Sequence, residues 1–269
     1  MYSEPIRLDG WLPDDLLPTE AVTSLDAVRD RFTADGASEI ILPEYTPISN
    51  QGRVGSCVAN STADMLEILL GIAREEAKLP IGDIPQLSRL FIYWVARARH
   101  MAQKKDEGTY IRLAAQQLME IGVPLESVWP YDPGKVYVSP PLEAYTMASD
   151  NKIKGLFRIT SSGGAKIEDI RAALQFRHPV VFGTIVGDDF GAYRGEEKVF
   201  GLPTHIKGRH AMIITGYRTR NNGSTDFYVR NSWGEGWGLN GHAWFSQEYI
   251  QDFQTQDLWV GTIMQELVL

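Results

Sequence analysis

The stretch Gln51-Gly52-Arg53-Val54-Gly55-Ser56-Cys57 joins a glycine-bearing turn to the start of a long helical pattern. From Cys57 to Ala73 apolar residues recur three and four positions apart, which is the spacing of an amphipathic helix. Ser56 stands where an N-cap residue is expected. The sequence therefore predicts that Cys57 begins a helix, where free backbone N–H groups and the helix dipole favour a thiolate.

Outward from this stretch, the patterns divide the chain into two halves. Helices are predicted at Leu87–Met101 and Ile111–Ile121, and Gly122 ends the second as a C′ glycine would. The later part is rich in strand patterns, with one more helix at Ile167–Phe176 and a hairpin turn at residues 221–224. The predicted strands are Lys154–Thr160, Val180–Val186, Ala211–Tyr217, Asp226–Arg230, Gly241–Ser246 and Trp259–Gln265.

These patterns predict an α+β fold. We expect a helical lobe at about residues 55–130 and a mainly antiparallel β lobe at about residues 131–269, within one domain that spans residues 41–269. Residues 1–40 are mixed and turn-rich. We expect them to form either a belt across the fold or a short propeptide-like, autoinhibitory segment.

Composition limits the partners and the location. The 269 residues are 43% hydrophobic, and 26 basic against 34 acidic side chains give a formal net charge of −8. This acidic balance argues against nucleic-acid binding, which needs a basic face. Apolar runs fall far short of the ~20 residues that span a bilayer, and no secretory signal is visible. We therefore expect a cytoplasmic protein with no membrane partner, and leave export without a cleaved signal open.

The chain has one cysteine. It can form neither an intrachain disulfide nor a cysteine-rich zinc site, which fits a reducing compartment. A lone cysteine is most often a small buried side chain. Cys57 differs because it begins a helix after a glycine-bearing turn, and because Gln51, six residues upstream, is placed to donate to a developing oxyanion.

A thiolate nucleophile needs a base and a group that orients that base. His210 opens the apolar strand pattern at the end of a glycine-containing loop, which would fix its ring well. Asn231 follows another predicted strand and precedes Ser232-Trp233-Gly234, with a second Trp-Gly pair at Trp237-Gly238. The other histidines are interpreted as surface or packing residues: His100, His178, His205 and His242.

Together these motifs resemble the papain family of cysteine peptidases. The order Gln51, Cys57, His210, Asn231 is that family's order, and the interval from Cys57 to His210 is 210 − 57 = 153 residues, near the roughly 130–150 typical of papain and cathepsins. The similarity covers roughly residues 40–250. Weaker matches lie at residues 87–91, 106–110 and 129–132, and the last two are similar to the bacterial and phage-type branch without disulfides.

The resemblance implies a two-lobed fold with a cleft between the helical lobe and an antiparallel β-barrel-like lobe. It implies a cysteine endopeptidase in which Cys57 and His210 form the reactive pair and Asn231 orients the histidine. The backbone N–H of Cys57 and the side chain of Gln51 would hold the oxyanion. No metal or organic cofactor is needed. The residues implied to contact a polypeptide substrate are Gly108, Arg209, Trp233 and Trp237.

This sequence departs from the family's pattern at two informative positions. Val54 stands where the family has the first cysteine of its Cys-Gly-Ser-Cys run, so that disulfide is absent. Arg209 precedes the histidine where an acidic or small residue is common, and would favour acidic or polar substrate residues if it reaches the cleft. Residues 1–40 are also too short for the long helical prodomain of secreted relatives.

Two alternatives to peptide hydrolysis stay open. The same acyl-enzyme would serve deamidation, transpeptidation or cleavage of an isopeptide bond. A catalytically silent protein that binds peptides is disfavoured because Gln51, Cys57 and His210 are all present. An unknown proteinaceous inhibitor is a further partner to consider. Nucleotide-binding, serine-hydrolase and zincin motifs are absent.

Overall fold

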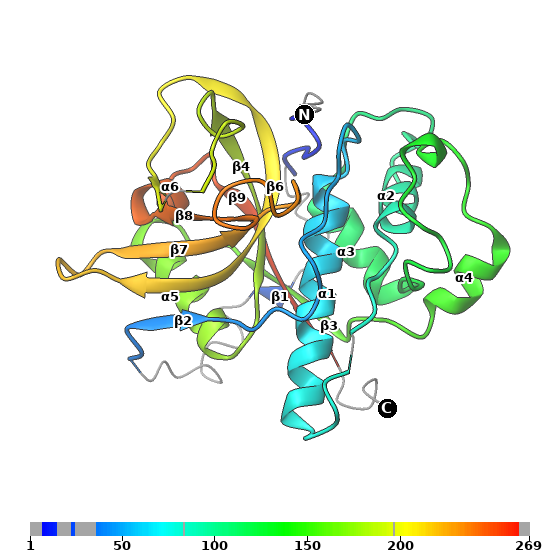
Figure 1. Cartoon of the computed structure of the whole chain (residues 1–269), viewed down its shortest axis with the longest axis horizontal. Coiled ribbons are helices and arrows are strands. Elements are labelled where there is room, and N and C mark those ends of the chain that lie inside the picture. The colour runs from blue at the N-terminus through cyan, green and yellow to red at the C-terminus, as the bar shows by residue number, and fades with distance from the viewer. Residues whose placement is uncertain (1–6, 15–22, 25–35, 83, 196, 264–269) are drawn as a thin grey trace.

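The computed structural model of the chain describes residues 7–14, 23–24, 36–82, 84–195 and 197–263. Helix α1 (Cys57–Glu76) runs between a helical half and a β half, as Figure 1 shows. The predicted α+β class with two lobes is confirmed. The remaining helices are α2 (Arg89–Ala98), α3 (Ile111–Glu120), the 3₁₀ helix η2 (Pro133–Lys135), α4 (Leu142–Ala148), α5 (Gly163–Gln175) and α6 (Gln247–Gln251).

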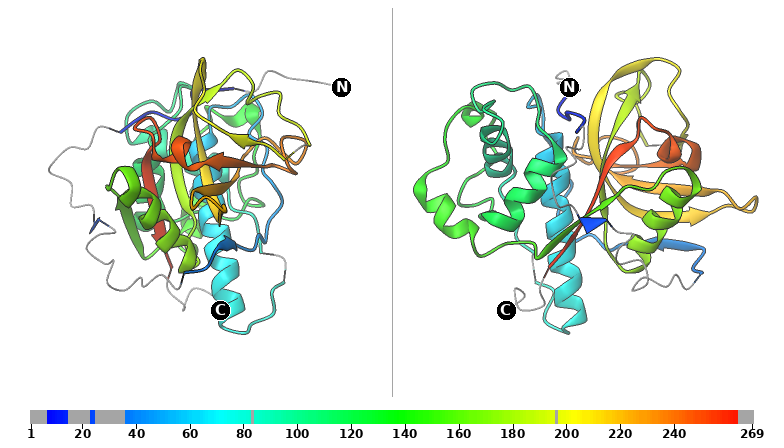
Figure 2. Two further views of the ribbon diagram at one scale, coloured as in Figure 1. Left: turned by 90° about the vertical axis from the view of Figure 1, so that its left-hand side faces the viewer. Right: turned by 180° about the vertical axis from the view of Figure 1, so that it is seen from behind.

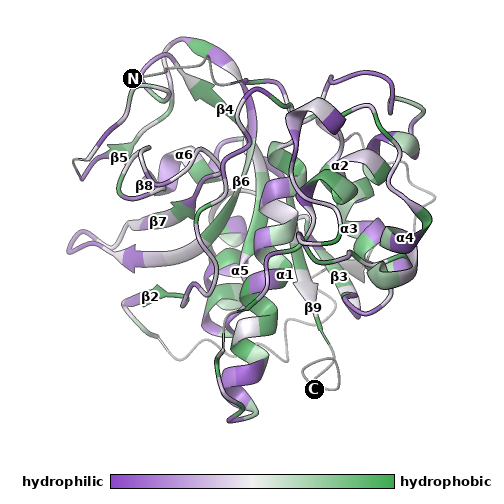
Figure 3. Cartoon of the chain, turned by 45° about the vertical axis from the view of Figure 1, so that its right-hand side comes forward, coloured by the Kyte–Doolittle hydropathy of each residue, from purple (hydrophilic) through white to green (hydrophobic). Residues whose placement is uncertain are grey.

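Helix α1 begins at Cys57, as predicted, and every residue from Cys57 to Ala73 is buried. The burial is continuous because β6 packs against one side of the helix and α2 and α3 against the other. Figure 3 shows the change to polar residues at the lower, C-terminal end of the helix, which projects beyond both halves. The expected capping by Ser56 is wrong in one respect: its hydroxyl bonds to Tyr131 and Asn60 and makes no cap hydrogen bond.

Within the described residues, the sheet has nine strands in the order β1-β3-β9-β4-β6-β7-β8-β5, with β2 pairing with β6. Neighbours are antiparallel except for the pairs β1–β3 and β5–β8. The order ends at β1 and β5, so the sheet is open and does not close into a barrel. The strands are β1 (Thr23–Ser24), β2 (Glu39–Ile41), β3 (Gly155–Ile159), β4 (Val180–Gly187), β5 (Val199–Phe200), β6 (Ile206–Thr219), β7 (Thr225–Arg230), β8 (His242–Ser246) and β9 (Gln256–Thr262).

Strands β4 and β6 form the centre of the molecule. All eight residues of β4 are buried, because helices α1 and α5 contact it from different sides (Figure 2). Burial on both faces explains why the sequence of this strand is continuously apolar and does not alternate. Strand β9 passes behind α1, where Gly261 lies against Met65, and so links the two halves.

Helix α4 packs with the helical half although it follows residue 131 in the chain. The rings of Tyr145 and Phe91 meet edge to face at 5.0 Å, and Gly122 lies against the carbonyl of Ala148. Gly122 has φ +90°, so the C′ role predicted for it after the α3 pattern is confirmed. The α4 helix thus extends the helical half beyond the segment that the sequence pattern assigned to it.

Residues 7–14 lie between the two halves, next to the start of α1 (Figure 1, dark blue). The Asp9 amide donates to the Arg209 carbonyl of β6 at 2.8 Å. On the helical side, the Thr109 amide donates to the Gly10 carbonyl at 3.1 Å, and the Leu12 amide donates to the Thr109 carbonyl at 3.0 Å. This segment therefore bridges the lobes, as expected of a belt, while residues 15–22 and 25–35 fall outside the described residues.

Candidate active site

Cys57 is completely buried at the first residue of α1. Its Sγ accepts a hydrogen bond from the backbone amide of Ala211, at 3.4 Å. Ala211 follows His210 in strand β6, which packs along α1. The strand therefore carries the predicted base to the start of the helix that carries the predicted nucleophile.

His210 is held from the β half. Its Nε2 lies 2.7 Å from Oδ1 of Asn231, an oxygen that also accepts the Ser232 amide at 2.8 Å. Because an amide oxygen can only accept, Nε2 carries the ring proton and Nδ1 keeps a free lone pair. The Trp233 ring packs over the imidazole at 4.7 Å between centroids and keeps water from the hydrogen bond. The arrangement is that of an oriented general base.

Gln51 is also buried, and both ends of its amide are held. Its Nε2 donates to the Val54 carbonyl at 3.0 Å, and its Oε1 accepts from the Ser232 hydroxyl at 2.7 Å. The backbones of Gln51 and Ser232 are hydrogen-bonded as well, at 2.9 Å. The loop before the nucleophile is thus joined to the loop that carries Asn231, so one hydrogen-bonded unit spans both halves.

Burial without a charged partner sets the ionisation of the reactive pair. It raises the pKa of the Cys57 thiol to about 12, although N–H groups from Ala211, Val58 and Cys57 itself favour the thiolate; the nearby Asp9 carboxylate adds to the rise. Burial also lowers the pKa of His210 to about 4, against the effect of its bond to Asn231. Near neutral pH both groups are uncharged in this structure.

The segment of residues 8–10 contributes to the burial of Cys57, because Gly10 lies directly over the sulfur. A Cβ on Gly10 would lie 2.7 Å from Sγ of Cys57, so only a glycine fits there without a shift. Gly108 and Gly208 provide matching space on the two sides: their missing Cβ atoms would meet the Gly10 carbonyl oxygen and the Leu8 Cβ at 2.6 Å. Three glycines thus allow the close backbone approach.

Ion pairs anchor both ends of this covering segment, residues 7–14. Arg7 pairs with Asp106 at 2.8 Å, and Asp14 pairs with Arg112 of α3 at 2.6 Å. The Arg112 pair is largely buried, whereas Arg7 is half exposed and contributes less. The segment is therefore fastened mainly at its second end, on the helical half.

Asp106 belongs to the weaker sequence match at residues 106–110, but the sequence predicts no role for it. Its Oδ1 accepts from the Gly55 amide at 2.9 Å and from the Tyr93 hydroxyl at 2.6 Å. The Tyr93 hydroxyl in turn accepts from the Gly108 amide at 3.1 Å. One carboxylate thus ties the turn before Cys57 to the loop against which the covering segment pairs. The only signal in the sequence is its place in this weaker match, two residues before Gly108.

The four predicted substrate-contacting residues fall into two groups. Gly108 and Arg209 contact the covering segment, at the mouth of the site. Trp233 packs on His210. Trp237 lies behind Trp233, is 1% exposed and donates its Nε1 to the Phe190 carbonyl, so it supports Trp233 and does not face the site. The direct substrate contact expected for Trp237 is not available in this arrangement.

Of the other histidines, His100 lies beside the covering segment, with its Nε2 3.2 Å from the Thr109 hydroxyl. His205 is exposed in its loop, and His242 bonds to Glu44. Over the described ranges no group of three histidine, cysteine, aspartate or glutamate side chains is arranged to hold a metal ion. In the same part of the chain, none of the helices combines the length and apolar character needed to cross a bilayer.

Comparison with known proteins places this geometry in context. The chain matches the papain family cysteine protease profile over residues 42–258. It is 32% identical to an uncharacterized peptidase C1-like protein of Acanthamoeba polyphaga mimivirus over 230 residues. The aligned region covers 82% of this chain and 71% of that protein. The chain is 26% identical to papain of Carica papaya over 234 residues, 82% of this chain but only 59% of papain's length.

Among solved structures, the fold is similar to xylellain, a cysteine protease from Xylella fastidiosa. The TM-score is 0.78 at 27% sequence identity, and the match covers 96% of this chain and 97% of that one. The similarity to xylellain thus extends over nearly the whole of both chains.

Proposed function

Because the chain belongs to the papain family of cysteine proteases, we propose that it is a cysteine endopeptidase with Cys57 as nucleophile and His210 as base. One observation carries the assignment. Strand β6 brings the His210–Ala211 backbone onto Sγ of Cys57, while Asn231 holds the far nitrogen of the imidazole. This leaves the unpartnered Nδ1 of His210 as the proton acceptor.

The chemistry follows from these positions. His210 takes the Sγ proton of Cys57, and the thiolate adds to the carbonyl carbon of the scissile amide. The carbonyl oxygen becomes an oxyanion, which the Cys57 amide and the Gln51 side chain stabilise as fixed donors. The C–N bond then breaks as His210 gives its proton to the leaving amine. Water, deprotonated by His210, hydrolyses the thioester and releases the acid, and the proton returns to the sulfur.

We also propose that the chain folds as a latent enzyme. Gly10 of the covering segment, residues 7–14, lies over Sγ of Cys57, and Cys57 and His210 are both completely buried. A buried, uncharged thiol is a poor nucleophile, because the thiolate is the reactive form. Displacement of this covering segment would admit water and substrate and allow the thiolate–imidazolium pair to form. This supports the autoinhibitory role over a purely structural belt.

An epoxide-type thiol inhibitor and an unstructured protein substrate test the assignment. We expect covalent labelling at Cys57 and cleavage of the substrate, both faster in Gly10→Ala, in which the covering segment is displaced, and both absent in Cys57→Ala. His210→Ala should lose labelling at neutral pH. Undiminished labelling in His210→Ala would show that the pairing is wrong. Labelling without cleavage would favour deamidation, transpeptidation or isopeptide cleavage.

A further inference from the structure

The side chain next to the covered sulfur fills a specific pocket. Gly10 lies on Sγ of Cys57, and the indole of the following residue, Trp11, is 1% exposed. The ring lies against Gly183 of β4, where a Cβ would come within 2.0 Å of the indole. The missing side chain at Gly183 therefore makes the space that the indole occupies.

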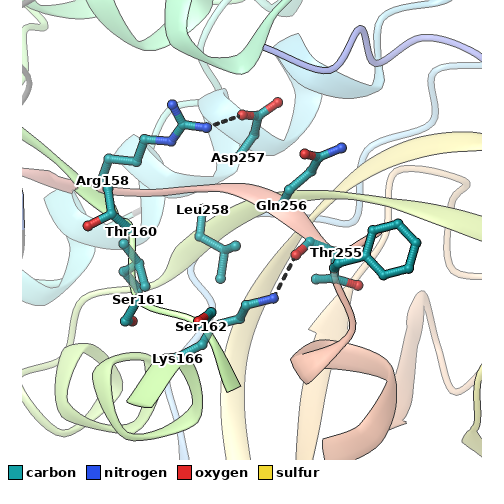
Figure 4. A pocket seen from close by; sticks show the side chains of 11 residues that line it. Arg158, Thr160, Ser161, Ser162, Lys166, Thr255, Gln256, Asp257 and Leu258 are labelled. Carbon is teal, nitrogen blue, oxygen red and sulfur yellow. Dashed lines mark hydrogen bonds and ion pairs between the residues drawn. The ribbon is translucent and has the colours of Figure 1, made fainter. Parts of the chain in front are cut away.

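The end of this pocket is polar and buried. Asp257 of β9 is 2% exposed, and its Oδ2 accepts the Trp11 Nε1 proton at 3.1 Å and the Asp14 amide at 2.9 Å. Its Oδ1 accepts from Arg158 at 2.7 Å, as Figure 4 shows at the wall of a neighbouring pocket. Burial raises the pKa of Asp257 to about 6, so at neutral pH the carboxylate is ionised and can only accept.

Departure of the covering segment would change the two carboxylate oxygens differently. Oδ1 would keep its Arg158 partner, whereas Oδ2 would lose both its protein donors and face the emptied pocket. A substrate side chain that displaces water from this pocket without supplying a donor would leave Oδ2 buried and unpaired, which is unfavourable, so the pocket favours a donor. Because Arg158 already balances the charge of Asp257, a neutral N–H donor suits the pocket better than a second cation.

The pocket also has room around the indole. A cavity of about 200 Å³ adjoins it, lined by residues that include Pro13, Ile185, Arg209 and Phe253. Phe253 is largely exposed, so the cavity is open to solvent on that side. The backbone carbonyl of Arg209 accepts a hydrogen bond from the Asp9 amide of the covering segment. A peptide entering from this side would therefore meet the indole pocket, one residue along the covering segment from the glycine that lies on the sulfur.

We propose that this Trp11 pocket, formed by Gly183 and Asp257, selects the substrate: polypeptides with a tryptophan within one or two residues of the scissile bond. The inference rests on the peptidase activity proposed above. Tryptophan fills the space left by Gly183 and supplies the proton that Asp257 accepts. Phenylalanine fills much of the same space but leaves Asp257 unpaired, and a site built to hydrogen-bond discriminates strongly against an analogue that lacks the donor.

Peptides that differ only in one side chain beside the cleavable amide provide the test. The enzyme is the full chain carrying Trp11→Ala, which empties the pocket, and the side chains compared are tryptophan, phenylalanine, lysine and alanine at each position near the amide. We expect kcat/KM for the best tryptophan peptide to exceed that of its phenylalanine counterpart by about tenfold, the effect of one lost hydrogen bond. Equal rates, or a preference for lysine, would overturn the inference.

Two further substitutions assign the preference to its residues. Asp257 has φ +53°, a conformation that asparagine tolerates, so Asp257→Asn should fold and reduce the ratio of tryptophan to phenylalanine towards one. Gly183→Val should lower cleavage of both aromatic peptides and spare the alanine peptide. Gly201→Val is the matched control, because nothing lies within 4 Å of the position of its missing Cβ. Unchanged selectivity in both Asp257→Asn and Gly183→Val would overturn the inference.

A second readout does not depend on peptide cleavage. The rate of Cys57 alkylation reports release of the covering segment in Trp11→Phe, Asp257→Asn and the double variant. If the indole N–H and Asp257 interact as described, each single substitution should raise the rate, and the double variant should exceed the larger single effect only slightly. If the rate increase in the double variant equals the product of the two single increases, the indole N–H and Asp257 act independently, and the pocket does not recognise the indole N–H. Absence of all peptide cleavage with coupled alkylation rates would count against the proposed peptidase activity alone.

Discussion

Cys57 at the start of α1 and the carboxylates Asp64 and Glu67 further along the same helix are all buried, but by different means. The thiol is buried uncharged, beneath residues 8–10. The two carboxylates face a buried guanidinium, Arg230 of β7, which is 1% exposed. One end of the helix thus hides the thiol that we propose acts as a nucleophile, and the middle hides carboxyl groups that have built-in partners.

The charged cluster joins the two halves of the molecule. Arg230 bonds to Asp64 at 3.2 Å and to Glu44 at 2.7 Å, and Glu44 also bonds to His242 of β8 at 2.5 Å. Glu67 accepts the Leu87 amide at 2.7 Å. These partners come from the helices, strands and loops of both halves, so the cluster cannot be opened without separating them.

The covering of Cys57 is different because it belongs to a single segment near the N-terminus. Residues 7–14 pair with Thr109 and Arg209 and are held by the ion pairs of Arg7 and Asp14. No helix of the helical half and no strand among β3 to β9 has to change for these contacts to break. Burial therefore stabilises the fold where the partners are built in, whereas burial by a segment that can leave is suited to controlling reactivity, as we propose for Cys57.

The largest effect is expected from Arg230→Met, which leaves Asp64 without its charged partner. Removing one member of a buried ion pair costs about 3–5 kcal/mol of unfolding free energy. Urea denaturation measures this loss. Arg220→Met is the control, because Arg220 is partly exposed and shares Asp226 with Arg218; it should cost about 1 kcal/mol or less. Equal losses would show that the cluster does not hold the halves together.

The next effect concerns pH. Burial and the neighbouring Asp64 raise the pKa of Glu67 from its ordinary 4.5 to about 8. The folded state therefore binds more protons than the unfolded state between these values, so the stability due to Glu67 is present at low pH and lost as the pH rises. Glu67→Gln, which resembles the protonated acid, should lie within about 1 kcal/mol of the wild type at pH 5 and exceed it by about 4 kcal/mol at pH 8.

Thermal melts of both proteins across this range would measure the difference. A wild type whose stability relative to Glu67→Gln does not fall between pH 5 and pH 8 would contradict the raised pKa. Such a result would mean that Arg230 keeps both carboxylates ionised and that the charged cluster resembles an ordinary salt bridge.

A smaller free-energy change, but a clear kinetic one, is expected from Gly10→Ala. The added methyl would sit 2.7 Å from Sγ of Cys57, and overpacking of this kind costs about 1–3 kcal/mol. Because the cost falls on the covering segment, alkylation of Cys57 should accelerate about tenfold or more while the urea midpoint changes little. Gly164→Ala, with open space around its Cβ position, is the control. An unchanged rate of Cys57 alkylation in Gly10→Ala would mean that residues 7–14 do not cover Cys57 in solution.

The smallest effect should come from Arg7→Gln. The Arg7–Asp106 pair is partly exposed on the arginine side, and such pairs contribute about 0.2–1 kcal/mol. Alkylation of Cys57 should rise less than about fivefold, and high salt should reduce the difference between the variant and the wild type. If Arg7→Gln raised the alkylation rate more than Gly10→Ala, the Arg7–Asp106 ion pair, and not the contact of Gly10 with the sulfur, would hold the segment in place.

The sequence predicted the elements whose signal is local. The start of α1 at Cys57, the helices α2, α3 and α5, the strands β3, β4 and β6 to β9, and the β6–β7 hairpin all follow from periodicity and turn residues, and each is present. The short strands β1, β2 and β5 have two or three residues each, too few to show a period. The α4 helix was not predicted for the same reason: its seven residues are too few to show a helical period.

By itself the sequence determined the fold class and the set of residues from which a site could be built, because motif order and helical spacing are properties of the chain. Only the tertiary structure decided that Gly10 covers Cys57, that Asp106 holds Gly55, and that Trp11 reaches Asp257 across 246 residues. Such contacts leave no pattern along the chain, because they depend on how the two halves pack. That packing determines whether the one cysteine is exposed or covered.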